Sequence, residues 1–332
     1  MKQRNRFFKA LVLGLACCSL LVVFSVSAFA ADDAYPSKPV RFIIPWPPGG
    51  GVDSVGRLMV PGLSERLGRQ VIVENRGGSA GLIGLEAAAK SAPDGYTITI
   101  LNDSYAFPPA FGEKMPFDPL KAFAPIGQIA RGDNVLVTHP DVQAKTVQEF
   151  IALLKQKPGQ MNCVTSGLAA VSHMVAEVFK VRTGTDFRIL HFQGGSPALI
   201  DLMGGHSHFG FLSVSNAKSN AEAGKLRILA VMGSSRSNLM PEVPTFAEAG
   251  GPGMEVDGWF GLAAPAGTPQ PIIDRLSREL REVLAVEELK TRFLKTGAEI
   301  QYSSPQAFGD RLVREIALWT DVVKAAGLKL ER

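Results

Sequence analysis

Residues 40–53 read VRFIIPWPPGGGVD, and this stretch predicts a strand, a turn and the start of a helix. Apolar and β-branched residues at 40–44 are typical of a strand, which Pro45 ends because proline cannot donate to a sheet ladder. Three glycines at 49–51 free the backbone to turn sharply and to approach a ligand closely. A loop that opens a helix presents bare N–H groups to a carboxylate or phosphate, although an ordinary strand-to-helix turn would look the same in sequence.

The first 30 residues predict a targeting segment, because basic residues precede an apolar run at 11–26 and residues 28–30 (AFA) fit a cleavage site. We expect export to the periplasm with cleavage after Ala30, with an uncleaved anchor or a lipidated leader cysteine as open alternatives. The leader holds four of the 35 Lys and Arg residues and none of the 31 Asp and Glu residues, so the mature chain is formally neutral. Its charge therefore gives no indication of nucleic-acid or anionic-membrane binding.

Strands and helices alternate along the mature chain, which predicts an α/β fold with parallel sheets. About 300 residues with the single cysteine Cys163 must be held by apolar cores alone, and this length favours two domains. Residues 111–132 lack periodicity and predict a crossing segment. We expect domain 1 at 31–131 and 255–332 and domain 2 at 132–254.

Pro61-Gly62 lies inside the first predicted helix and predicts a kink or an interruption there.

Polar and aromatic residues near predicted strand ends are candidate ligand contacts. Ligands of open α/β sheets bind beyond the carboxyl ends of strands, so Asn102 and Ser104 are placed to face the same crevice as the glycine loop. A solvated turn would use the same residues. Aromatic side chains near strand ends suit either a pocket wall or core packing. They are Trp46, Tyr105, Phe107, Phe192 and Trp259.

Two short motifs indicate other chemistry. Residues 77–81 match G-x-S-x-G between a predicted strand and a helix, which is the setting of a hydrolase nucleophile, Ser79. Sequence spacing marks no acid or histidine as its partner, and the glycines also explain a simple loop. His206 and His208 share one strand face and could hold zinc, but no third ligand is marked by spacing. No nucleotide-binding glycine motif is complete.

Several segments together give the chain a family resemblance. It resembles the periplasmic solute-binding receptors of tripartite tricarboxylate transporters, the Bordetella uptake gene family, over nearly the whole mature chain. The segments that carry the resemblance are 35–40 (YPSKPV), 45–53 (PWPPGGGVD), 73–76 (VENR), 92–96 (APDGY), 158–160 (PGQ), 197–205 (PALIDLMGG), 223–227 (AGKLR), 241–245 (PEVPT) and 264–269 (APAGTP).

This resemblance implies a two-lobed periplasmic binding protein that captures a small carboxylate in the cleft between its lobes. It implies delivery to the membrane subunits of a transporter, with no enzymatic activity, cofactor or metal, and we expect a monomer. A ligand sensor of the same fold that feeds a signalling partner is the alternative. The ligand-binding residues are expected to be Trp46, Pro48, Gly49, Gly50, Asp53 and Ser104 on one side, and Thr165, Ser166, Gly167, Phe192, Gln193, Gly194 and Ser213 on the other.

The chain departs from the family pattern at the second side of the expected cleft. Residues 192–194 read FQG where the family often has Tyr-Lys-Gly, and Leu212-Ser213 stands where an aspartate is common. Ala169 and Val171 replace the more usual glycine and serine. These departures make the cleft less polar, so we expect a mono- or dicarboxylate ligand with an apolar or aromatic body.

Overall fold

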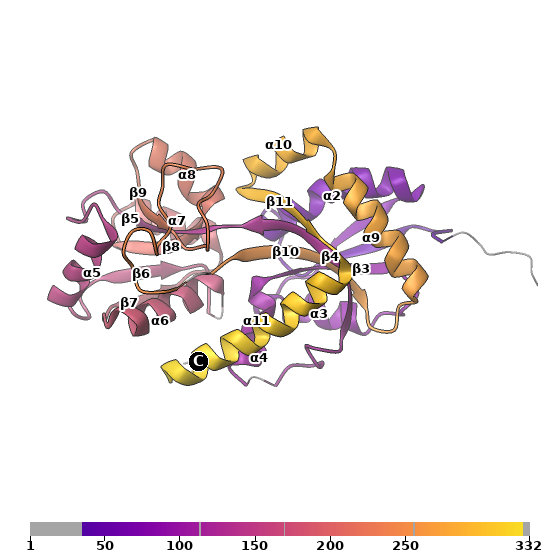
Figure 1. Cartoon of the computed structure of the whole chain (residues 1–332), viewed down its shortest axis with the longest axis horizontal. Helices are drawn as coiled ribbons and strands as arrows, with labels where there is room; N and C mark the ends of the chain where they lie inside the picture. The colour runs from indigo at the N-terminus through magenta and orange to yellow at the C-terminus, as the bar shows by residue number, and fades with distance from the viewer. Residues whose placement is uncertain (1–34, 113, 169, 255, 328–332) are drawn as a thin grey trace, which may run out of the picture. The chain divides into compact units, whose positions relative to one another are not determined.

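The structure is a computed structural model that describes residues 35–327 except 113, 169 and 255. The targeting segment predicted for residues 1–30 therefore lies outside the described residues. From Lys38 onward the described residues form one body, which is built around two β-sheets with helices on their faces (Figure 1). None of the helices described has the length and apolar character that crossing a membrane requires.

The first sheet has six strands in the order β11-β4-β10-β3-β1-β2. Helices α2, α9 and α10 cover one face, and α3, α4 and α11 cover the other (Figure 1). The strands are β1 (Val40–Ile44), β2 (Val71–Asn75), β3 (Thr97–Asn102), β4 (Phe123–Gly132), β10 (Gly258–Pro265) and β11 (Ala298–Ser303). The helices are α2 (Gly51–Leu67), α3 (Leu82–Ala89), α4 (Phe107–Ala110), α9 (Gln270–Leu284), α10 (Glu287–Lys295) and α11 (Pro305–Ala326), with 3₁₀ turns η1 (Ser79–Gly81) and η2 (Asp103–Ala106).

The second sheet has five strands in the order β7-β6-β8-β5-β9. Its strands are β5 (Asn134–Thr138), β6 (Asn162–Thr165), β7 (Arg188–His191), β8 (Phe209–Ser213) and β9 (Arg227–Val231). Its helices are α5 (Val147–Gln156), α6 (Val171–Thr183), α7 (Gly195–Met203) and α8 (Val214–Glu222). Each sheet with its helices forms one lobe.

Both sheets are mixed, which corrects the prediction of parallel sheets. β1 lies parallel to β2 and β3, whereas β10 is antiparallel to β3 and β4, and β11 is antiparallel to β4. In the second sheet β6 is parallel to β7 and β8, whereas β5 is antiparallel to β8 and β9. The antiparallel strands β4, β5 and β10 are those that carry the chain between the sheets.

The segment predicted only as a crossing contains β4, a strand of 10 residues between β11 and β10. Pro125 and Gly127 make this strand difficult to predict from the sequence, because both residues disfavour sheet interiors. Register shifts against β10 and β11 accommodate them. At Gly127 a Cβ would lie 2.8 Å from the backbone oxygen of Ser303, so the glycine permits the close approach of β11.

Helix α2 continues through Pro61 and ends at Leu67, so the predicted interruption does not occur. Packing explains the glycine that follows the proline. A Cβ on Gly62 would lie 2.8 Å from a methyl group of Val283, so this glycine lets α9 pack closely against α2.

The chain passes from the first sheet to the second between Gly132 and Asn134 and returns between Val231 and Gly258. The return segment is fixed to the first sheet at β11. There Glu299 accepts hydrogen bonds of 2.7 Å from both the backbone N–H and the side-chain amide of Asn238.

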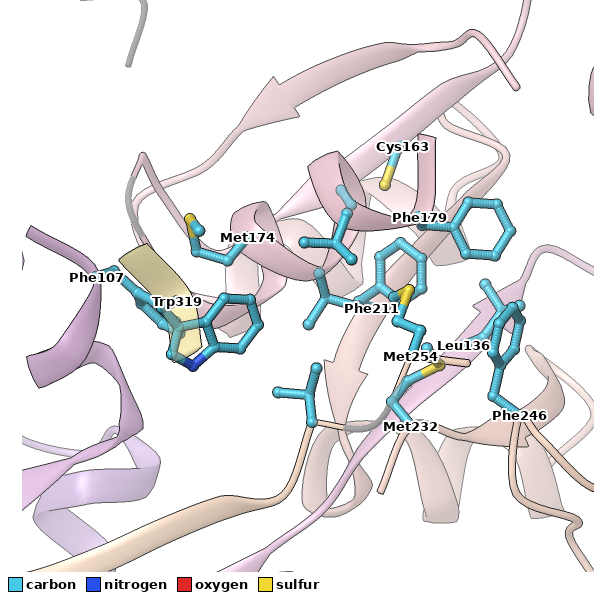
Figure 2. Packing of buried hydrophobic residues seen from close by; sticks show 14 of the residues in the cluster. Phe107, Leu136, Cys163, Met174, Phe179, Phe211, Met232, Phe246, Met254 and Trp319 are labelled. Atoms are coloured by element: carbon cyan, nitrogen blue, oxygen red, sulfur yellow. The ribbon is translucent and has the colours of Figure 1, made fainter. Parts of the chain in front are cut away.

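One apolar cluster spans both lobes behind the crossing strands. Figure 2 shows Trp319 of α11 and Phe107 beside Met174 of α6, with Phe179 and Phe211 deeper in the second lobe. The rings of Phe107 and Trp319 meet edge to face, with centroids 5.0 Å apart. The C-terminal helix therefore packs on the first lobe and also helps to bind the lobes together.

Thr146 provides a test of the local structure in the second lobe. It caps α5, because its hydroxyl accepts a hydrogen bond of 3.2 Å from the N–H of Glu149. We expect Thr146→Ala to lower the free energy of unfolding by about 1 kcal/mol, measured by urea denaturation. Thr146→Ser, which keeps the hydroxyl, should stay close to the parent protein, and equal losses for both variants would contradict the capping role.

Candidate ligand-binding cleft

A cavity of about 470 Å³ lies between the loops that follow the strands of the two sheets. Each lobe contributes loops at which a strand ends and a helix begins. The first lobe lines it with Trp46, Pro47, Pro48, Gly49, Gly50, Gly51, Val52, Val55, Asn102, Asp103, Trp259, Phe260, Thr296, Gly297 and Ala298. The second lobe and the crossing strand add Gly132, Asp133, Asn134, Ser166, Ala170, Val171, Ser172, Gln193, Gly194, Gly195, Ser196, Pro197, Phe211, Leu212, Ser213 and Asn216.

Three helices begin at this cavity after a residue whose side chain cannot cap them. The residues before α2, α6 and α7 are Gly50, Ala170 and Gly194, none of which carries a side chain that can accept a hydrogen bond from the first turn. All three residues line the cavity. Because the first N–H groups of a helix have no partner within the helix, they are available to an anion, which the helix dipole also favours.

The charges around the cavity are unusual for an anion site. Among its described lining residues there is no Lys, Arg or His, while two carboxyl groups, Asp103 and Asp133, are present. An anion bound here must therefore be held by N–H groups, hydroxyls and side-chain amides rather than by a cationic side chain.

The buried side chain of Asp53, which is 3% exposed, fixes the shape of the first glycine loop by hydrogen bonds. Its Oδ2 accepts a hydrogen bond of 2.9 Å from the N–H of Gly49, and its Oδ1 accepts one of 2.8 Å from the side-chain amide of Asn75. Arg57 donates to both oxygens at 2.9 Å. The same Asn75 amide donates to the carbonyl of Trp46 at 2.9 Å. This network holds both ends of the loop.

The pKa of the Asp53 carboxyl reflects this network. Burial alone would raise its pKa, but hydrogen bonds from Arg57, Gly49 and Asn75 outweigh burial and lower it. The carboxylate is therefore charged at neutral pH, and it supports the loop in that form.

The loops of the second lobe are tied to one another through their backbones. The N–H of Phe192 donates to Thr165 and the N–H of Gly194 donates to Ser166, each at 3.0 Å. The N–H of Ser166 in turn donates to the hydroxyl of Ser172, at 2.8 Å. The loops after β6 and β7 thus form one unit, and this unit places Ser166 and the N-termini of α6 and α7 at the cavity.

The structure brings eight of the thirteen predicted site residues to the cavity lining. The other five are not part of the lining. Asp53 and Ser104 are buried, Thr165 shares a hydrogen bond of 2.8 Å with His191, Gly167 forms the turn before α6, and Phe192 packs on the core of the second lobe. The eight at the lining are Trp46, Pro48, Gly49, Gly50, Ser166, Gln193, Gly194 and Ser213.

The sequence reasoning missed several lining residues. Asp103 follows Asn102 directly, and the rule that ligands bind beyond strand ends would have included it. Asp133 lies in the crossing between lobes, and the turn at Thr296–Ala298 precedes a strand that was not predicted. These positions reach the cavity only through the tertiary fold.

The two carboxyl groups at the cavity differ in their partners. Asp133 is held on both oxygens by Arg131, at 2.8 and 3.0 Å, yet burial still raises its pKa above the usual value. Burial, and then the nearby carboxylate of Glu315, raise the pKa of Asp103 to about 7. Asp103 therefore changes charge near neutral pH.

The two motifs that suggested other chemistry lie away from the cavity. Ser79 is exposed at the start of η1, and neither it nor His206 or His208 is part of the lining. Within the described part of the chain, no group of three or more His, Cys, Asp and Glu residues is arranged to hold a metal ion.

Comparisons with known proteins agree with the fold. The family model described as "Tripartite tricarboxylate transporter family receptor" matches residues 55–328. The chain is 34% identical to the protein BugT of Bordetella pertussis over 324 residues, which cover 96% of this chain and 98% of that protein.

Solved structures give the same result. The periplasmic binding protein BugD is 28% identical, with a TM-score of 0.80 and coverage of 89% of this chain and 99% of that one. The R. palustris protein Rpa4515, solved with adipate, is 32% identical, with a TM-score of 0.81 over 89% of this chain and 99% of that one. These matches confirm the predicted two-lobed binding-protein fold. The matched family and structures are those of solute-binding proteins rather than enzymes, which confirms the expectation of a non-enzymatic function.

Proposed function

Because the chain belongs to the receptors of the tripartite tricarboxylate transporter family, we propose that it captures a small carboxylate in its cleft and delivers it to the membrane subunits of such a transporter. The observation that carries this proposal is the convergence of three uncapped helix N-termini on one cavity. The adipate-bound relative supports it, because adipate is a carboxylate. The site would be in the periplasm, after cleavage of the leader at Ala30, and the receptor would act as a monomer.

The two lobes would be the domains predicted from the sequence, 31–131 with 255–332 and 132–254. The distribution of strands between the sheets supports this division, since β1–β4, β10 and β11 form one sheet and β5–β9 form the other. The crossing strands between them would act as the hinge of a closing movement.

The ligand would be a mono- or dicarboxylate with an apolar or aromatic body. Apolar side chains make up much of the lining, and they come from both lobes. The carboxylate would be received by the N–H groups that begin α2, α6 and α7, each helix contributing about 0.3–1 kcal/mol. Apolar side chains that can contact the body are Trp46, Val52, Val55, Val171, Phe211, Leu212 and Phe260.

Capture requires contacts that the ligand makes better in the closed form than in the open form. A carboxylate that bridges the glycine loop of the first lobe and the paired loops of the second lobe meets this condition, because the lobes must approach for both sets of N–H groups to reach it. The closed receptor would then be the form that the membrane subunits recognise.

The direct test is to identify the ligand. Mass spectrometry of small molecules released from denatured protein, together with a thermal-shift screen of carboxylates, should give a carboxylate that raises the melting temperature. Stabilisation only by sugars or cations would contradict the proposal. Unchanged uptake of the identified ligand in cells that lack the receptor would contradict the transport role while leaving binding intact.

Gly50→Val tests the glycine loop. The backbone of Gly50 is extended, and a Cβ there would come no closer than 3.8 Å to the carbonyl oxygen of Pro47, so the variant should fold. Its isopropyl group would stand at the N-terminus of α2 and should weaken carboxylate binding at least tenfold, or about 1.4 kcal/mol, measured by calorimetry. Gly50→Ala is the graded control with a smaller expected loss. Undiminished affinity in the valine variant would exclude this loop from the site.

A further inference from the structure

The carboxyl group of Asp103 at the cavity has one oxygen engaged and one free. The residue is 8% exposed in η2, immediately after β3, and it lines the cavity. Its Oδ1 accepts hydrogen bonds from the N–H of Ser104 at 2.9 Å and from the side-chain amide of Asn102 at 3.0 Å. Its Oδ2 receives no hydrogen bond from the residues that the structure describes. Because Asp103 lines the cavity, this oxygen is available to a hydrogen-bond donor of a ligand.

Two glycines, rather than residues with side chains, lie beside Oδ2. A Cβ on Gly258 would lie 3.0 Å from Oδ2, and the facing residue of the crossing strand is Gly132, which also lacks a side chain. Both Gly132 and Asp103 line the cavity. Neither glycine has a side chain that could cover Oδ2 of Asp103.

Two arginines of the first lobe, Arg311 and Arg131, form their hydrogen bonds with groups other than Asp103. Arg311 of α11 donates to Glu315 at 3.0 Å, to Gln128 at 3.1 Å and to the carbonyl of Asp257 at 2.8 Å. Arg131 of β4 is held by Asp133, as described above. Asp103 thus faces Arg311 and the carboxylate of Glu315 from the α11 side, and forms no ion pair with a described residue.

We propose that Asp103 is a specificity-determining residue, which accepts a hydrogen bond from a hydroxyl or ammonium group of the ligand and discriminates against a second carboxylate at that position. This inference rests on the proposed function, because it assumes that the ligand's first carboxylate occupies the helix N-termini. Like charges at contact distance repel, whereas a donor satisfies the free oxygen. The preferred ligand class is then a monocarboxylate that carries a separate hydrogen-bond donor.

The proposal predicts opposite responses to pH for two ligand classes. The Asp103 carboxyl, with a pKa of about 7, is mostly neutral at pH 6 and mostly ionised at pH 8. A second carboxylate needs the neutral form, so its affinity should fall about tenfold between these pH values. A hydroxyl group can donate to the ionised form, so its affinity should stay constant or rise as the pH increases.

Calorimetry on the purified full chain, with matched pairs of compounds at pH 6 and pH 8, tests this. The pairs are adipate with 6-hydroxyhexanoate and terephthalate with 4-hydroxybenzoate. We expect the hydroxy acid of a binding pair to bind more tightly than the dicarboxylate at pH 8. Asp103→Asn keeps the size of the side chain but removes its charge, so it should abolish the pH dependence of dicarboxylate binding. It should also reduce the preference for the hydroxy acid over the dicarboxylate at pH 8 about tenfold.

Glu315→Gln is the second variant, and it lies outside the cavity lining. Removing this carboxylate should lower the pKa of Asp103, so the midpoint of the pH dependence should move to lower pH while the preference for the hydroxy acid remains. This shift would support the proposal even if Asp103→Asn failed to fold. A purely structural role for Asp103 would not move the midpoint.

Equal pH dependence for both members of a pair, or an unchanged preference in Asp103→Asn, would overturn the inference and leave carboxylate capture standing. Failure of all four compounds to bind, with no carboxylate found in the thermal-shift screen, would overturn the proposed function and this inference together. Failure of the four compounds while the screen finds another carboxylate would overturn only the ligand class inferred here.

Discussion

Gly258→Ala is expected to lower the free energy of unfolding by at least about 3 kcal/mol, with a fall in melting temperature of roughly 6–10 °C. A Cβ at this position would lie 2.0 Å from the carbonyl oxygen of Gly132, its partner on the neighbouring strand β4. Contacts below 3.0 Å cannot persist, and here the obstructing atom belongs to the backbone, so it cannot rotate away as the end of a side chain can.

The consequence should reach the cleft as well as the fold. β4 and β10 can separate only by weakening the ladder at the point where the chain crosses between the lobes. The same Cβ would lie 3.0 Å from Oδ2 of Asp103. We therefore expect carboxylate affinity to fall at temperatures where the variant is still folded.

Thermal unfolding followed by circular dichroism measures the first effect, and calorimetry measures the second. Gly253→Ala is the matched control, because a Cβ there would meet no atom within 4 Å and the backbone does not require glycine. It should unfold close to the parent temperature. If Gly258→Ala and Gly253→Ala had the same stability, the close approach of β4 and β10 at Gly132 and Gly258 would be contradicted.

Asp53→Ala should weaken carboxylate binding at least tenfold and lower the free energy of unfolding by about 2 kcal/mol. The substitution leaves the N–H of Gly49, the amide of Asn75 and the guanidinium of Arg57 without their common acceptor. Arg57 is half exposed and can turn to water, so the stability loss should be smaller than for a fully buried ion pair. The affinity loss follows because the glycine loop loses its fixed shape.

The pH response of this network has a definite sign. Because the folded protein lowers the pKa of Asp53, its contribution to stability is present above the unfolded pKa of about 3.9 and is lost as the pH falls through the lower folded value. The Asp53→Ala variant should therefore lose less stability than the parent protein on acidification into that range.

Two control variants distinguish the loss of loop support from the general effect of removing a carboxylate. Asp53→Asn keeps an acceptor oxygen and should lie between the parent and Asp53→Ala in affinity. Glu65→Ala removes an exposed carboxylate from the same helix, α2, and should change neither stability nor binding. Parent-like affinity in Asp53→Ala would show that the loop does not need this support.

The strand, loop and helix at residues 40–67 could be predicted because their signals are local. Apolar β-branched residues, prolines and glycines act within a few positions of one another, and they gave the strand and the start of the helix. β4 and β11 could not be found this way. Pro125 and Gly127 argue locally against a strand, and only the close approach of β11 shows why a glycine is needed.

The candidate site divides in the same way. The family resemblance named the eight predicted residues that line the cavity, because its motifs can be matched to positions along the chain. The same reasoning placed Asp53 among the ligand contacts, whereas its side chain turns under the loop and holds Gly49. Whether a side chain faces a cavity or supports it depends on contacts with distant residues, here Asn75 on β2.

The sequence by itself determined the two-lobed α/β class and the glycine loop at residues 49–51 that opens the first helix, since periodicity, breakers and family motifs lie along the chain. Only the tertiary structure decided the polarity of the cleft. Asp103 and Asp133 come from separate strand ends. Because Arg131 and Arg311 bond to other groups, one oxygen of Asp103 has no hydrogen-bond donor among the residues that the structure describes. The burial of a carboxyl group and the choice of its hydrogen-bond partners depend on which residues come together in the tertiary structure. A local sequence pattern therefore cannot predict them.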